Sequence, residues 1–338
     1  MKTYNLISRL WRYIPFKRKK HFFYLLIVMI ITSFAEMLTI SSVLPFLGAL
    51  SSPESVYYNH WFNFIFVFFR IDNPDDILFI LAILFCIFAV FSALMRLSLL
   101  YFQNYVGYYT GVDLSEKIFS ITLHQPYSEH VKQNTSVIIA GVTKKSKDLV
   151  VNFILPILNI LSSLFIFIAI VFSLFLINPF ITIMSILIFF TVYVLIGLSS
   201  VRLLKIYSYR INKETDQSIK SIQEGLGNIR DVIIYGYQNI FSLVFKNADL
   251  PLQKSIAMVK VIGGSPKFII EAIGMVFFAF LAYSFFGTES GIVSALPILG
   301  TLALASQKIL PIIQQAYFSW AKFRGSYDSI LEALILLE

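Results

Sequence analysis

Six apolar runs divide this sequence, and each is long enough for the roughly 20 residues that a helix needs to cross a bilayer. The runs predict six transmembrane helices at approximately residues 22–50, 77–100, 150–177, 180–204, 268–286 and 292–313. Composition agrees, because 57% of the 338 residues are hydrophobic and only 14% are charged, too few charges for a water-exposed surface. The 34 Phe and 18 Tyr exclude a disordered chain, and Cys86, the one cysteine, excludes a disulfide framework. The predicted fold class is therefore an all-α integral membrane protein.

Basic residues are unevenly distributed among the connections. Residues 1–20 hold seven Lys and Arg and no acidic residue, whereas residues 54–76 carry a net charge of −3. The connection 205–267 holds nine basic and five acidic residues. Because cytoplasmic loops are enriched in Lys and Arg, we expect both termini and both long connections in the cytoplasm. The net charge of +8 then reflects membrane orientation, and no nucleic-acid partner is expected.

The connections also alternate in length. Those after the third and fifth runs are turns of a few residues, whereas 101–149 and 205–267 span about 50 and 60 residues. Both long connections lack strand-like alternation and are rich in helix formers, so we expect the helices to continue into the cytoplasm as two hairpins. The first hairpin is predicted to reverse at Gln125-Pro126, since proline rarely continues a helix, and the second near Gly225 and Gly227.

Two further segments are amphipathic or apolar without spanning. Residues 6–14 place apolar side chains at helical spacing, with Arg9 and Arg12 between them, which predicts that residues 1–20 form an interfacial segment on the inner leaflet. Residues 60–69 (HWFNFIFVFF) are almost wholly apolar but too short to span. They are expected to form an outer-face helix in contact with lipid, or else a packed lid without lipid contact.

Several strings resemble one family, the ABC exporters, and within it the bacterial lipid-linked oligosaccharide flippases of the PglK type. The likeness covers essentially the whole chain and includes both predicted hairpins and the last two spans. The strings are LHQPY at 123–127 with His130 and NTS at 134–136, EGLGNIRDV at 224–232 with Tyr235-Gly236, SPKF at 265–268 with Glu271, and ASQKILP at 305–311.

The resemblance implies a type 1 exporter transmembrane domain at residues 21–330, six long helices with two cytoplasmic hairpins, and the start of a linker at 331–338. It further implies a homodimer in a bacterial inner (plasma) membrane, in contact with lipid and driven by a nucleotide-binding domain that holds ATP and Mg²⁺. No Gly is followed directly by Lys here, so the phosphate loop G-x-x-x-x-G-K-[ST] is absent. We therefore expect no ATPase activity or cofactor in this chain alone, with the motor domain supplied in trans or lost.

Ionisable residues within or beside spans are costly and are site candidates by default. A substrate cavity is predicted to include Arg96, Lys267, Lys308, Glu36 and Glu271. Lys267 and Lys308 lie in strings that match the family, where the resemblance implies that basic residues face a central cavity and suit a pyrophosphate group. For the cations the alternative is snorkelling at the inner interface. Glu271 could instead pair with Lys267 at i+4. Glu36 could pair with Arg96 or Lys308, or it could take a proton-coupled role.

The resemblance also implies that the hairpin ends contact the motor domain. The residues concerned are Gln125, Pro126, Tyr127 and His130 in the first hairpin and Glu224, Gly225 and Gly227 in the second. The four histidines show no metal-ligand spacing and no Ser/His/Asp arrangement is recognisable, so no catalytic or metal-binding residue is predicted.

Three functions remain open from sequence. The first is ATP-driven flipping of a lipid-linked oligosaccharide or a similar anionic amphiphile, which a basic cavity favours. The second is export of a peptide or drug by the same fold, and the third is a truncated membrane protein without transport activity. A secondary transporter is disfavoured, because no inverted repeat with paired broken spans is recognisable.

Overall fold

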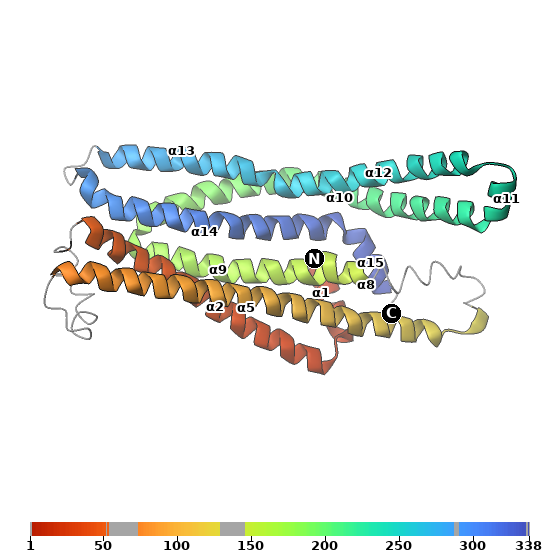
Figure 1. Cartoon of the computed structure of the whole chain (residues 1–338), viewed down its shortest axis with the longest axis horizontal. Helices are drawn as coiled ribbons and strands as arrows, with labels where there is room; N and C mark the ends of the chain where they lie inside the picture. The colour runs from red at the N-terminus through yellow and green to blue at the C-terminus, as the bar shows by residue number, and fades with distance from the viewer. Residues whose placement is uncertain are drawn as a thin grey trace.

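The computed structural model describes residues 2–51, 53, 74–128, 146–286, 291–335 and 337. Within these residues the chain is helical and contains no strand. Figure 1 shows the long helices side by side along one axis. In chain order the elements are α1 (Lys2–Tyr13), α2 (Phe16–Ser51), α5 (Pro74–Leu123), α8 (Ser146–Leu149), the π-helical turn η3 (Val150–Ile154), α9 (Leu155–Ile177), α10 (Pro179–Gly227), α11 (Ile229–Ile234), α12 (Gln238–Gly264), α13 (Pro266–Phe286), α14 (Gly291–Gly325) and α15 (Tyr327–Ile335).

Five segments of the described chain are long and apolar enough to cross a membrane. They are Phe16–Ser51, Ile77–Leu123, Ser146–Ile177, Pro179–Gly227 and Gln238–Ser284. The prediction of long apolar helices is thereby confirmed for the first five runs. The sixth run, 292–313, lies within the continuous helix α14 but is not among these five segments, so a count of six spans remains a prediction.

Two helices are much longer than a bilayer requires. The 50 residues of α5 and the 49 of α10 extend for about 75 Å at 1.5 Å per residue, against a hydrocarbon core of roughly 30 Å. The sharp turn between α9 and α10 has a local cause: the side chain of Asn178 accepts the Ile181 N–H at 3.1 Å and Pro179 takes the first helical position. The turn lies at the end of the molecule opposite α11 (Figure 1).

The second hairpin reverses later than the sequence suggests. Helix α10 continues through Gly225 and ends at Gly227, so Gly225 does not form the turn. The chain instead reverses through α11 and through Gly236, whose φ of 70° lies in the left-handed region that glycine tolerates. The prediction near Gly225 and Gly227 thus locates the end of α10, and the reversal itself takes the next ten residues before α12 begins.

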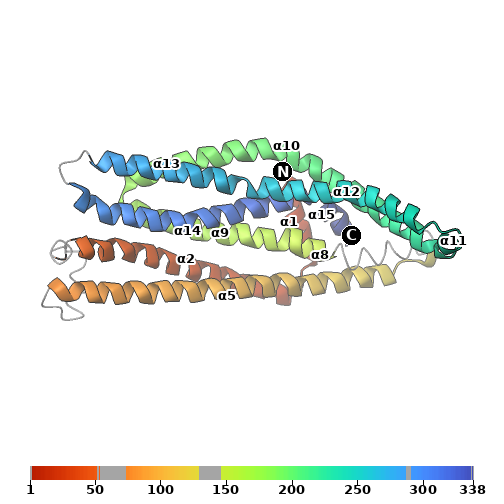
Figure 2. The same ribbon diagram turned by 45° about the horizontal axis from the view of Figure 1, so that its top comes forward.

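A bundle of α2, α5, α9 and α14 forms the main core, and α10, α12 and α13 pack against one side of it, chiefly on α14 (Figures 1 and 2). The first hairpin packs closely at Gly107 and Gly111, one helical turn apart on α5. A Cβ on Gly107 would lie 2.5 Å from Leu155 Cδ2, and one on Gly111 would overlap Val150 Cγ2. The two glycines therefore let α5 approach η3 and the start of α9.

The C-terminal helix α15 is attached to α10 by side chains. Ser208 Oγ donates to Asp328 Oδ2 at 3.1 Å, and Asn212 Nδ2 donates to Glu332 Oε1. Helix α15 also packs against α8 and α1. It thus connects the long hairpin to the start of the third predicted span.

Candidate functional site

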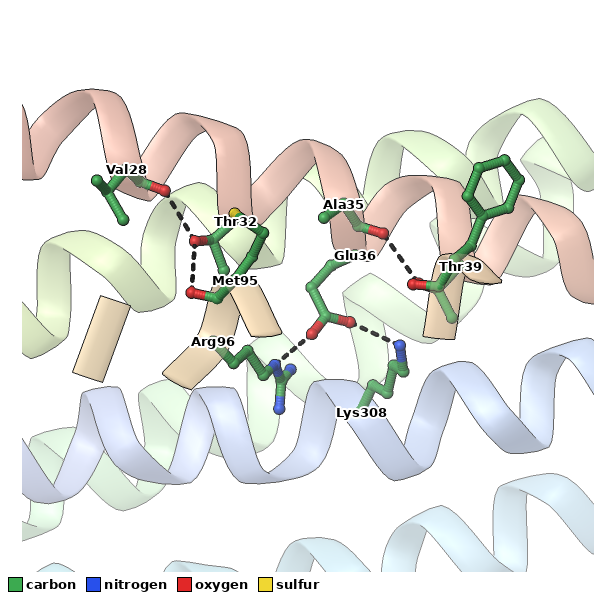
Figure 3. Close-up of polar contacts among 9 residues, drawn as sticks. Val28, Thr32, Ala35, Glu36, Thr39, Met95, Arg96 and Lys308 are labelled. Atoms are coloured by element: carbon green, nitrogen blue, oxygen red, sulfur yellow. Dashed lines mark hydrogen bonds and ion pairs between the residues drawn. The ribbon is translucent and has the colours of Figure 1, made fainter. Parts of the chain in front are cut away.

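Glu36 is the centre of a three-helix charge cluster near the middle of α2. Its side chain is only 1% exposed. One carboxylate oxygen pairs with Arg96 Nε on α5, and the other accepts Lys308 Nζ on α14 at 2.7 Å (Figure 3). Three segments distant in sequence therefore meet at one carboxylate.

Two threonines fix the position of Glu36 between α2 and α5. Thr32 Oγ1 donates to Met95 O at 3.3 Å as well as to Val28 O in its own helix (Figure 3). Thr39 Oγ1 likewise donates to Phe88 O on α5, at 3.1 Å. Because Thr32, Glu36 and Thr39 are spaced by four and three residues, all three share one face of α2. The hydroxyls hold that face against α5 on both sides of the carboxylate.

The cluster carries one more positive charge than negative, since Arg96 and Lys308 share the single carboxylate of Glu36. The Lys308 side chain is 29% exposed and that of Arg96 41% exposed. Arg96 Nη2 is nevertheless buried, and it has no hydrogen-bond partner in the part of the chain that the structure describes. A buried donor without an acceptor costs roughly 1–3 kcal/mol, so the cluster can accept a further anionic group.

A cavity of about 300 Å³ adjoins the cluster. Apart from the three charged residues its walls are mainly small or apolar, with Ser92, Thr39 and Gln307 as further polar members. The lining residues are Glu36, Thr39, Ile40, Val43, Phe85, Ala89, Ser92, Ala93, Arg96, Leu304, Gln307 and Lys308. This is a small, positively charged cavity between α2, α5 and α14.

The structure does not bring Lys267 and Glu271 to this cluster. Both side chains are exposed on α13, and neither lines the cavity. No ion pair joins these two described residues to each other, although their i,i+4 spacing allows one. Their assignment to a substrate cavity remains a prediction from the sequence.

The residues assigned to motor coupling lie at one end of the molecule. Gln125, Pro126 and Tyr127 follow the end of α5, and the Tyr127 side chain is highly exposed. Glu224, Gly225 and Gly227 lie in the last turn of α10, at the same end (Figure 1). His130, residues 134–136 and the apolar segment 60–69 lie outside the described residues.

The pairing of Glu36 with Arg96 and Lys308 was offered from the sequence as an alternative and is present, but other polar contacts between helices were missed. Arg18 Nε donates to Asp113 Oδ2 at 2.6 Å and joins the start of α2 to α5. The threonines that flank Glu36 were also missed, although their spacing around a mid-span carboxylate is a readable signal. Within the described residues no group of three or more His, Cys, Asp and Glu side chains is placed to hold a metal ion.

The family comparison agrees with the long apolar helices. The model of the ABC transporter transmembrane region matches residues 21–312, a stretch that includes Glu36, Arg96 and Lys308. No curated protein sequence matches the chain. Domains of this family partner with nucleotide-binding domains and contact lipid. Since the match covers most of the chain, this membrane protein belongs to the ABC transporter transmembrane-region family.

Proposed function

We propose that this chain is the membrane-embedded part of an ATP-driven exporter whose cargo is an anionic amphiphile, with a lipid-linked oligosaccharide as the favoured class. The observation that carries the proposal is the cluster at Glu36. It has an excess positive charge and a buried N–H of Arg96 that finds no acceptor among the described residues, and an uncompensated cation within a span costs several kcal/mol.

A phosphate or pyrophosphate group satisfies the cluster chemically. Its oxygens accept from Arg96 Nη2 and attract the ammonium of Lys308, while Glu36 keeps the two cations in place. Charge-assisted hydrogen bonds of this kind are roughly twice as strong as neutral ones. A cavity of about 300 Å³ is at the lower limit for a small-molecule site, so it suits the phosphate part of the cargo. The saccharide then occupies space formed with a second copy, and the lipid tail stays in the bilayer.

The remaining parts of the proposal come from the family and from the sequence. The chain acts as a homodimer of six-span domains with cytoplasmic termini. A nucleotide-binding domain outside residues 1–338 binds ATP and Mg²⁺ and contacts the hairpin ends at Gln125–Tyr127 and Glu224–Gly227. Export of a peptide or a cationic drug is the competing function, because it requires no anion site.

The test requires a variant that removes the charges of Arg96 and Lys308 without leaving the Glu36 carboxylate buried and unpaired. Replacing only Arg96 and Lys308 by Ala leaves Glu36 buried and unpaired, which is strongly destabilising in itself. The triple variant Glu36→Gln, Arg96→Gln and Lys308→Gln keeps polar groups of similar size and removes every charge. Lys220→Gln on α10, where the lysine is exposed and pairs with Glu224 one turn away, serves as the control.

Binding of a polyprenyl pyrophosphate is compared with binding of the matching uncharged polyprenol to the purified chain in nanodiscs. The native chain and Lys220→Gln are expected to prefer the pyrophosphate by about tenfold or more, and the triple variant is expected to lose the preference. Flipping in proteoliposomes with the nucleotide-binding partner should fall in parallel. An unchanged preference in the triple variant would overturn the anionic-cargo function.

A further inference from the structure

We propose a structural binding site for one anionic phospholipid of the inner leaflet, in a groove between α1, α2 and the start of α9. The acyl chain lies in the groove and the phosphate lies on Lys19. None of the residues that line the groove lines the cavity at Glu36, so this site is separate from the cargo site. The inference does not depend on what the protein transports.

The groove has a volume of about 460 Å³ and is almost entirely apolar. Helix α1 runs across the direction of the long helices (Figure 2) and contributes Leu10 and Trp11, and Ile14 follows directly after its end. Helix α2 contributes Lys19, Phe22, Phe23, Leu25, Leu26 and Met29, and η3 with α9 contributes Phe153, Ile154, Ile157, Leu158 and Leu161. Lys19 is the one charged residue among them. An apolar cavity of this kind excludes water, whereas a hydrocarbon chain fills it and restores the missing dispersion contacts.

The dimensions of the groove match one leaflet. Lys19 and Met29 are ten residues apart on α2, which is about 15 Å of helix. That is half of the roughly 30 Å hydrocarbon core. Lys19 lies near the start of α2, at the predicted cytoplasmic side, and Met29 lies deeper. A lipid with its head group at Lys19 therefore extends its chain toward the bilayer centre along the groove.

The chemistry at Lys19 suits a phosphate group. Its ammonium lies 5.5 Å from the centre of the Trp11 ring, which holds the side chain at the edge of the groove, and no carboxylate of the described chain pairs with it. The neighbouring Arg18 differs, because Asp113 already binds its guanidinium. Residues 1–20 contain no acidic residue that could compete. Anionic lipids are enriched at the cytoplasmic surface, and each nearby Lys contributes about 1 kcal/mol to their attraction, or roughly fivefold in affinity.

The fluorescence of Trp11 can report which lipid occupies the groove, because this side chain lines it. Trp61→Phe and Trp320→Phe leave Trp11 as the one tryptophan of the full-length chain. This double variant is reconstituted in two sets of nanodiscs. One set contains a small fraction of phosphatidylglycerol with brominated acyl chains, and the other contains the same fraction of brominated phosphatidylcholine. Bromine quenches tryptophan on contact, so the ratio of quenching by the two lipids reports the preference of the groove for an anionic head group.

Lys19→Gln is the test variant, and Lys20→Gln is the matched control, because Lys20 is adjacent and stacks on Phe16 but does not line the groove. We expect about fivefold stronger quenching by brominated phosphatidylglycerol, loss of that excess in Lys19→Gln and its retention in Lys20→Gln. Ile157→Phe, which fills the groove at a half-buried position, should lower quenching by both lipids. Equal quenching by both lipids in the native chain, or equal losses in the two lysine variants, would show only a diffuse attraction to a basic segment and would overturn the site.

Discussion

At the scale of single residues, the stability of the bundle depends on a carboxylate that would be unfavourable if either cation were missing. Glu36 is 1% exposed, and its ion pairs connect α2 to both α5 and α14. An isolated buried carboxylate costs far more than its hydrogen bonds return. The pairing is therefore a structural requirement as well as a candidate binding feature.

Replacement of Glu36 by Gln should lower stability and raise anion affinity together. The change leaves Arg96 and Lys308 close together without a counter-charge, and we expect a loss of about 3 kcal/mol or less, since both cations are partly exposed. Polyprenyl pyrophosphate should bind Glu36→Gln more tightly than the native chain. Thermal unfolding of both proteins in one detergent at a fixed scan rate measures the first effect. A further Lys308→Met change should restore part of the stability, and no such rescue would mean that the ion pair is not the cause.

At the scale of elements, close helix packing depends on two glycines that ordinary propensity disfavours. Gly in a helix interior costs up to about 1 kcal/mol relative to Ala. Gly107 and Gly111 nevertheless occupy α5 where it meets Leu155 and Val150. The cost is offset by the contact that the missing side chains permit.

Gly111→Ala should therefore destabilise the protein even though alanine favours helix. The new methyl group overlaps Val150 Cγ2 in η3, so η3 or α5 has to shift. Gly197→Ala on α10 is the matched control, because a Cβ there meets nothing within 4 Å and should be neutral or stabilising. Adding Val150→Ala to Gly111→Ala should recover part of the lost melting temperature. If Gly111→Ala is as stable as Gly197→Ala, the close approach of α5 does not require glycine.

The sequence predicts elements far better than it predicts contacts. The apolar runs locate the long helices, and residues 6–13 fall within α1 as the amphipathic spacing predicts, with Ile14 just beyond its end. The π-helical turn at Val150–Ile154 and the reversal at Gly236 leave no comparable pattern, because both depend on how neighbouring segments pack. The pair between Glu36 and Lys308 joins residues 272 positions apart; the sequence offers it as one possibility, and the packing of α2 against α14 selects it.

At the scale of the whole molecule, the distribution of charge predicts how the bundle is oriented in the membrane. The basic N-terminal residues lie near the start of α2, and the long basic connection 205–267 forms the far end of the α10–α12 hairpin (Figure 1). Many large apolar side chains on α10, α12 and α13 are exposed, among them Phe190, Leu198 and Phe268. Surfaces of this kind need lipid or a second copy to cover them.

Topology is tested by labelling with a membrane-impermeant maleimide in intact cells, after Cys86→Ala removes the native thiol. Glu289→Cys, in the short connection before α14, should react from outside, because short loops opposite the basic ends are expected there. Lys213→Cys on α10 should react only after the membrane is permeabilised. Reaction of Lys213→Cys in intact cells would reverse the orientation and with it the assignment of the Lys19 groove to the inner leaflet.

The attachment of α15 to α10 has a mechanical consequence. Asp328 and Glu332 accept hydrogen bonds from Ser208 and Asn212, and the two bonds lie one helical turn apart on each helix. Helix α15 therefore cannot slide along α10 without first breaking both bonds. A pull on the C-terminal helix is therefore passed sideways to the long hairpin as well as along α14. Helix α15 also packs against α8 and α1. While the two hydrogen bonds hold, a rotation of α15 is transmitted to α10 and so to the hairpin. Once both bonds break, α15 and the hairpin can move independently.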